Sequence, residues 1–172
     1  LAKAFVRGRD YRAAIDQITR IIEVCPWSSE LRELRAECHV AQGDTMSAIS
    51  DIRSTTKLQS DNTAGFFKLA TLYYQRGEPT ESLKEVRECL RLDPEHKDCF
   101  PHYKIVKKVD KLLNDAQESI NNKDYDDCIE SANKVLKVET EVPMIIFLAK
   151  EKLCHCYLHN DQLTHSLQSC RE

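Results

Sequence analysis

The densest group of chemically reactive side chains lies near the end of the chain. Cys154 and Cys156 flank His155, and His159 follows four residues later. Thiolate and imidazole groups at such spacing are ligands that zinc prefers, and a C-x-C pair is one arrangement for thiol exchange. A helix, however, points Cys154 and Cys156 in different directions, and the βαβ setting of thioredoxin-like redox motifs is missing. We therefore expect no metal or other cofactor here, and ordinary packing or a disulfide for these thiols.

The motifs of common enzymes are missing from the rest of the sequence. No P-loop, GxGxxG, GxSxG or HExxH occurs, and the six histidines are scattered. With 25 Lys and Arg against 28 Asp and Glu, the net charge of −3 gives no support for binding nucleic acid. No apolar run approaches the roughly 18 residues that a membrane span needs. We expect a protein that is not an enzyme, that binds no nucleic acid and that does not cross a membrane.

The elements that position these residues are expected to be helices. The 172 residues include only 4 Gly and 5 Pro, well below the roughly 12% of an average globular protein. Such a shortage leaves few turn residues and argues against all-β folds. Apolar residues also recur at spacings of three and four, as at Ile15, Ile18 and Ile22. The prediction is an all-α fold.

A period of 34 residues organises the expected helices. Two columns of small residues recur at this step, one containing Ala2, Ala36 and Ala70 and the other Ala14, Ala48 and Ser82. A third column, in which Pro94 is one member, ends the second helix of each repeat. This is the tetratricopeptide (TPR) pattern, in which small residues lie where two antiparallel helices cross closely. We predict a right-handed superhelical solenoid of antiparallel helix pairs.

The register slips after residue 96. Cys128 takes the place of Ser82 in the small column, but 46 residues later instead of 34. Apolar residues keep helical spacing from about 102 to 122, which predicts one connecting helix about 32 Å long. The last repeat begins near Phe147, four residues late. We predict two parts, 1–100 with a truncated first repeat and 101–172 with the long helix, further repeats and a truncated last one.

The first helix of each TPR pair lines a concave groove that usually binds peptides or partner proteins. The Lys and Asn pattern by which TPR adaptors hold the C-terminal carboxylates of Hsp70 and Hsp90 is not matched here. The equivalent positions carry an acidic stripe followed by apolar and hydroxyl side chains. These candidate groove residues are Glu30, Glu33, Glu37, Phe67, Thr71 and Tyr74. Two interpretations stay open, a groove for extended, partly apolar or basic segments, or a solvated face with ordinary packing between helices.

Several stretches are more specific than a TPR period. They are Leu31–Cys38, Glu85–Leu90, 102–104 and 154–156. Together they resemble the central-to-late TPR region of the DnaJ homolog subfamily C member 3 family, also described as an interferon-induced kinase inhibitor. The resemblance implies residence in the endoplasmic reticulum lumen, a place in the unfolded protein response, and binding of unfolded or misfolded clients for the luminal Hsp70.

The resemblance leaves alternatives for the role of this chain. The His-Pro-Asp tripeptide of a J domain does not occur in the sequence, so contact with the luminal Hsp70 is expected through a J domain outside this chain. One alternative is a kinase-inhibitory module that binds an eIF2α kinase. Another is a rigid spacer without a client site of its own.

The resemblance also implies a disulfide pattern. The lumen is oxidising, and the family's spacing matches the pairs Cys89–Cys99 and Cys154–Cys170. Loops of this size stabilise the folded state by about 3 kcal/mol each in the chain-entropy model. The remaining thiols are expected to be free, with Cys128 as a packing residue. These are Cys25, Cys38, Cys128 and Cys156.

Overall fold

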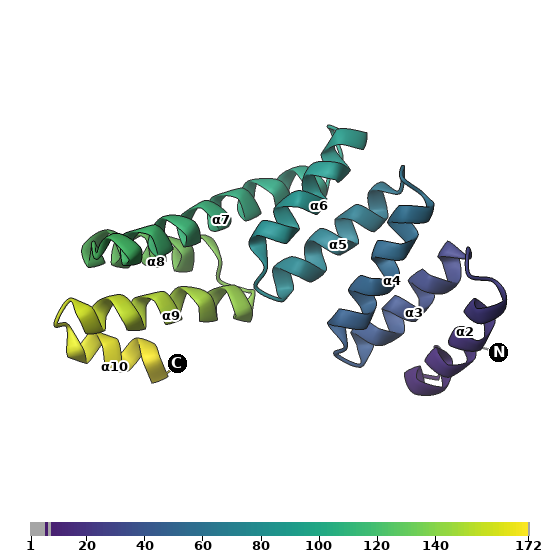
Figure 1. Ribbon diagram of the computed structural model, residues 1–172, viewed down its shortest axis with the longest axis horizontal. Helices are drawn as coiled ribbons and strands as arrows, with labels where there is room; N and C mark the ends of the chain where they lie inside the picture. The colour runs from purple at the N-terminus through teal and green to yellow at the C-terminus, as the bar shows by residue number, and fades with distance from the viewer. Residues whose placement is uncertain (1–5, 7, 172) are drawn as a thin grey trace.

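The computed structural model of the protein describes residue 6 and residues 8–171, and these residues form helices without any strand (Figure 1). The helices are α2 (Tyr11–Val24), α3 (Ser29–Ala41), α4 (Thr45–Leu58), α5 (Thr63–Gln75), α6 (Pro79–Leu92), α7 (Cys99–Asn122), α8 (Tyr125–Val138), α9 (Pro143–His159) and α10 (Leu163–Arg171). Each helix packs mainly on its neighbours in chain order. The all-α prediction is confirmed. Ala2, a member of one small column, lies outside the described residues.

Most helices begin at a residue whose side chain caps the first turn. In each case a side-chain oxygen accepts a hydrogen bond from the backbone N–H three residues further on, which satisfies a donor without a partner inside the helix. These N-caps are Asp10, Ser28, Asp44, Asn62 and Asp124. The helix boundaries are thus encoded locally, by short polar side chains at the positions where the 34-residue period predicts a break.

The small columns lie at the helix crossings. Ala14, Ala48, Ser82 and Cys128 are all fully buried. The hydroxyl of Ser82 donates to the backbone carbonyl of Ala70 at 2.6 Å, so a polar side chain is accommodated in the column with its hydrogen bond satisfied. Close approach of the two helices in each pair explains why no larger side chain occupies these positions.

The long connecting helix is present and runs without interruption through Lys111. Helix α7 has 24 residues, and it begins at Cys99, three residues before the predicted start. The earlier start is compatible with Pro101 because the first turn of a helix needs no backbone donor from that residue. The helix ends at Asn122, and the C-cap residue Lys123 has a left-handed backbone with φ 63°.

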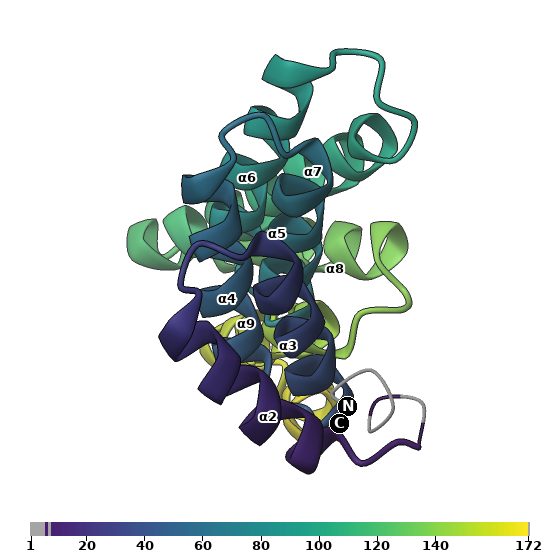
Figure 2. The same ribbon diagram turned by 90° about the vertical axis from the view of Figure 1, so that its right-hand side faces the viewer.

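Helices α9 and α5 meet although three helices, α6–α8, separate them in the chain (Figure 1). The Tyr74 hydroxyl donates to Glu139 Oε2 at 2.7 Å. Gly77, with φ 78°, lies in the turn after α5, and a Cβ there would come within 3.2 Å of Leu148 and 3.3 Å of Met144. We call these five residues the joint. It fixes α7–α10 at an angle to α2–α6 (Figure 1). In the perpendicular view of Figure 2, α2 lies in front and the following helices lie behind it.

One apolar core crosses the joint. The largest cluster of buried residues runs from Ala70 in α5 to Ala149 in α9 and includes Val106 and Val109 of α7. It therefore continues through residue 100, where the sequence suggests a division of the chain. Within the described residues no helix has the length and apolar character that crossing a membrane requires.

Candidate peptide-binding surface

Three disulfides connect neighbouring helices. The structure joins Cys89 to Cys99, Cys128 to Cys156 and Cys154 to Cys170. The first and third are the two pairs that the resemblance implies. The second is a correction, because Cys128 and Cys156 were expected to be free thiols. Helix α9 is consequently bound covalently on both sides, to α8 through Cys156 and to α10 through Cys154.

The position of Cys156 in its repeat explains the unexpected bridge. It occupies the same place in its helix as Cys38 does in α3, and Cys128 occupies the same place as Ala14 does in α2. Ala14 and Cys38 share one buried cluster, and Cys128 and Cys156 share another. The packing contact is thus the same in both repeats, and it becomes a disulfide where both residues are cysteine. Cys128 is indeed fully buried, but it is bonded there.

The disulfides remove the zinc and thiol-exchange interpretations of Cys154 and Cys156. Each sulfur is bonded to a different partner, so neither is available as a thiolate ligand and the two do not form a C-x-C bridge. A second group, Cys89, His96 and Cys99, has its ligand atoms within 4.8 Å of one another. Two of its three members are consumed by a disulfide, so this group does not offer a zinc site either.

The two remaining thiols should differ strongly in reactivity. Cys25 is half-buried, whereas Cys38 is fully buried. Burial, and in addition the neighbouring Glu37, raises the pKa of the Cys38 thiol, and the thiolate is the reactive form. Alkylation of the native protein without reductant should therefore label Cys25 rapidly and Cys38 only on unfolding, as peptide mapping can show. Labelling of Cys128 or Cys156 under these conditions would contradict the Cys128–Cys156 bridge.

Tyr74, predicted as a groove residue, belongs to the joint instead. Only 4% of its surface is exposed, and burial together with the Glu139 hydrogen bond raises its pKa. For Glu139, burial by itself acts to raise the pKa. The Tyr74 hydroxyl and the backbone N–H groups of Glu141 and Val142 outweigh that effect and hold the pKa below its usual value. The correction follows from α7, whose length brings Glu139 to Tyr74.

Removing the Tyr74 hydroxyl should weaken the joint. Tyr74→Phe takes away a hydrogen bond to a charged, buried acceptor, and we expect the free energy of unfolding to fall by about 2 kcal/mol at pH 7. Because the folded-state pKa of Glu139 is depressed, its stabilisation is present above the unfolded pKa and is lost as the pH falls through the folded pKa. In Tyr74→Phe, which lacks the hydroxyl donor, this loss of stability should begin at a higher pH. Urea unfolding between pH 4 and 7 measures both effects, with Tyr103→Phe in α7 as the control. An unchanged pH profile would contradict the assignment.

The candidate groove residues on α3 and α5 border an apolar pocket. Its volume is about 370 Å³, and Ala36, Glu37, Val40, Ile52, Phe67, Lys68, Thr71, Leu72 and Gln75 line it. Three predicted residues, Glu37, Phe67 and Thr71, therefore lie together. Glu33 lies one turn before Glu37 on α3, and exposed Glu30 one turn before that. Sequence reasoning missed Val40, which is 46% exposed at the pocket.

Charges at the edge of the pocket are only partly compensated. Lys68 Nζ lies 3.8 Å from Glu33 Oε2 and 3.5 Å from Glu37 Oε1. The amide of Asn62 also donates to Glu33 at 3.1 Å. One lysine thus faces two carboxylates, so the rim has an excess of negative charge over an apolar floor.

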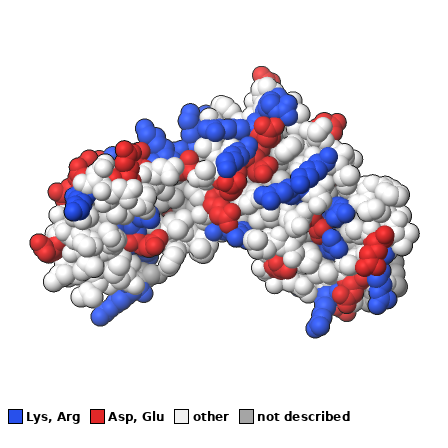
Figure 3. Space-filling model, in the orientation of Figure 1, with Lys and Arg blue, Asp and Glu red and all other residues white. Residues whose placement is uncertain are grey.

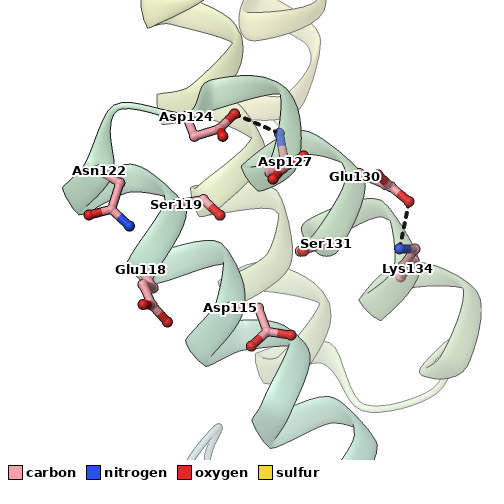
Figure 4. Close-up of a pocket in the computed structure, with 9 residues that line it drawn as sticks. All are labelled: Asp115, Glu118, Ser119, Asn122, Asp124, Asp127, Glu130, Ser131 and Lys134. Carbon is pink, nitrogen blue, oxygen red and sulfur yellow. Dashed lines mark hydrogen bonds and ion pairs between the residues drawn. The ribbon is translucent and has the colours of Figure 1, made fainter.

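A second hollow lies between α7 and α8 and is acidic (Figure 4). Its volume is about 390 Å³. Asp115 and Glu118 of α7 face it from one side, and Asp127 and Glu130 of α8 from the other; Glu130 is paired with Lys134 at 2.6 Å. Figure 3 shows acidic side chains gathered over this end of α7 and α8, while charges of both signs alternate over α3–α6. The walls of the hollow between α7 and α8 are polar, unlike those of the α3–α5 pocket.

Comparison with known proteins agrees with the resemblance found in the sequence. No protein-family model matches the chain. It is 47% identical over 165 residues to DnaJ homolog subfamily C member 3 of Mus musculus and 46% identical over 169 residues to that of Homo sapiens. These alignments cover 96% and 98% of this chain but 33% of each relative, so the chain spans about a third of their length.

A solved structure gives the same result. The P58(IPK) TPR domain superposes with a TM-score of 0.93 at 45% identity, over 99% of this chain and 47% of that one. The predicted TPR solenoid and the resemblance to this family are thereby confirmed. The chain is a TPR segment related to TPR and J-domain co-chaperones, which are a non-catalytic class.

Proposed function

We propose that this chain, a relative of DnaJ homolog subfamily C member 3, is the protein-binding TPR segment of an endoplasmic-reticulum co-chaperone. It binds unfolded or misfolded client polypeptides, and a J domain outside the chain passes them to the luminal Hsp70. The observation that carries the proposal is the open apolar pocket on the helix face with which TPR arrays bind peptides. The three disulfides support a luminal location, because such bridges persist in oxidising compartments.

Site-specific crosslinking tests this function. A photoreactive residue at Val40 should capture a reduced, carboxymethylated model client. The same residue at Leu58 should not, although its exposure of 48% matches the 46% of Val40, because Leu58 ends α4 away from the pocket. Equal capture at the two positions, or none at either, would count against client binding in this pocket.

A rigid spacer is the second candidate, and the joint favours it. Tyr74 and Glu139 tie α5 to the start of α9, and disulfides staple α9 to both neighbours. A chain built only to hold its ends at a constant angle needs these features and no pocket. The spacer alternative predicts that a photoreactive residue at Val40 captures no client. No feature of the described residues favours the kinase-inhibitory alternative over these two.

A further inference from the structure

The pocket between α3 and α5 has the dimensions for side chains and not for a folded element. Its volume of about 370 Å³ is at the lower end of the roughly 300–1,000 Å³ range of ligand pockets. Ala36, Ile52 and Leu72 form a buried apolar floor, while Phe67 is half-buried and Val40 half-exposed at the wall. An aliphatic or aromatic side chain entering here exchanges water for apolar surface on several sides.

The acidic rim lies directly beside this floor. Glu37 lines the pocket, and its side chain is 61% exposed. Glu33 lies one helical turn away, with 33% of its side chain exposed. Lys68 is shared between them and is the only cation among the described residues that line the pocket. A second cation can therefore approach Glu37 without displacing Lys68 from Glu33.

The arginines of α3 do not neutralise this rim, because they are bound elsewhere. Arg35 makes two hydrogen bonds to the buried carboxylate of Asp51, at 2.6 and 2.7 Å. Arg32 donates to the backbone carbonyl of Pro26 at 2.9 Å. Both guanidinium groups therefore serve the contacts of α3 with α2 and α4, and the pocket side of α3 keeps its negative charge.

Resting on the proposed function, we propose that this pocket selects extended client segments in which a large apolar side chain and a Lys or Arg lie two residues apart. In an extended chain, side chains two residues apart point to the same side and lie about 6.6 Å apart. The apolar side chain then fills the pocket while the basic one reaches Glu37 at the rim. A segment with Glu in place of the basic residue meets like charge there.

Two fluorescent peptides test the selection, one containing Phe-x-Lys and the other Phe-x-Glu in otherwise identical sequences. Fluorescence anisotropy should show about tenfold tighter binding of the Lys peptide, with the difference shrinking in 0.5 M NaCl as the exposed charges are screened. The double variant Glu33→Gln/Glu37→Gln should weaken the Lys peptide about fivefold and strengthen the Glu peptide about twofold, because the repulsion at the rim is removed, so that the two peptides bind about equally. Glu118→Gln/Glu130→Gln removes the same charge from the acidic hollow and is the matched control.

The outcomes separate this inference from the function on which it rests. Equal affinity for the two peptides, or an equal effect of the control variant, overturns the charge selection even if Val40 still captures denatured client. Binding of neither peptide by a protein that captures client at Val40 overturns it as well. Failure of capture at Val40 overturns the client-binding function itself.

Discussion

Replacing Cys128 and Cys156 together by alanine should lower the free energy of unfolding by about 3.5 kcal/mol. The bridge joins residues 28 apart, and the chain-entropy model gives that value for a loop of this length. Both sulfurs are fully buried, so part of their packing is also lost. Alanine is the least disruptive choice, because Ala14 occupies the position of Cys128 in the first repeat. Urea unfolding without reductant measures the change.

The double variant is preferable to a single one because of the neighbouring bridge. A lone thiol at Cys156 would lie two residues from Cys154, and a free thiolate can attack an adjacent disulfide. Cys25→Ala is the control, since it removes a half-buried thiol without a bridge and should change the unfolding free energy by less than about 0.5 kcal/mol. A loss below about 1 kcal/mol for the double variant would show that the 128–156 loop is already restricted in the unfolded chain.

The 34-residue repeat made most of the fold predictable, because the residue types that it requires are set by contacts within and between neighbouring helices. A small residue is needed wherever two helices cross, so Ala14, Ala48 and Ser82 locate the helix pairs without knowledge of the tertiary structure. Helix α7 was predictable for a similar reason, since its apolar spacing continues past the point where a 34-residue repeat would break. The first residue of α7 was harder to predict, because Pro101 is compatible both with a turn before the helix and with the first turn of the helix.

The Cys128–Cys156 disulfide had a sequence signal that is visible only when the repeats are aligned. Helix α9 has 17 residues where α3 has 13, and these four additional residues displace Cys156 from a strict repeat. With that shift included, Cys156 aligns with Cys38, and its partner position is the small column occupied by Cys128. The joint had no such signal. Tyr74 and Glu139 are 65 residues apart, and their contact depends on the length and direction of α7 as a whole.

The same register predicts a disulfide that can be introduced. Ala14→Cys should pair with the buried, free Cys38 and raise the free energy of unfolding by about 3.4 kcal/mol, because the new loop spans 24 residues. The expectation rests on equivalence, since Ala14 and Cys38 lie in one buried cluster as Cys128 and Cys156 do in another. Non-reducing mass mapping identifies the bridge, and urea unfolding with and without reductant measures its contribution.

Formation of this bridge should be slow in the folded protein and complete when oxidation accompanies folding. Burial and Glu37 raise the pKa of Cys38, so little of the attacking thiolate is present at neutral pH once the thiol is enclosed. Ala48→Cys is the matched control. It lies in the same small column one repeat later, but the position equivalent to Cys38 is Leu72, so its thiol should stay unpaired. A bridge from the thiol introduced by Ala48→Cys to another cysteine, or free thiols at both positions 14 and 38 after oxidative refolding of Ala14→Cys, would show that the helix pairs do not share one geometry.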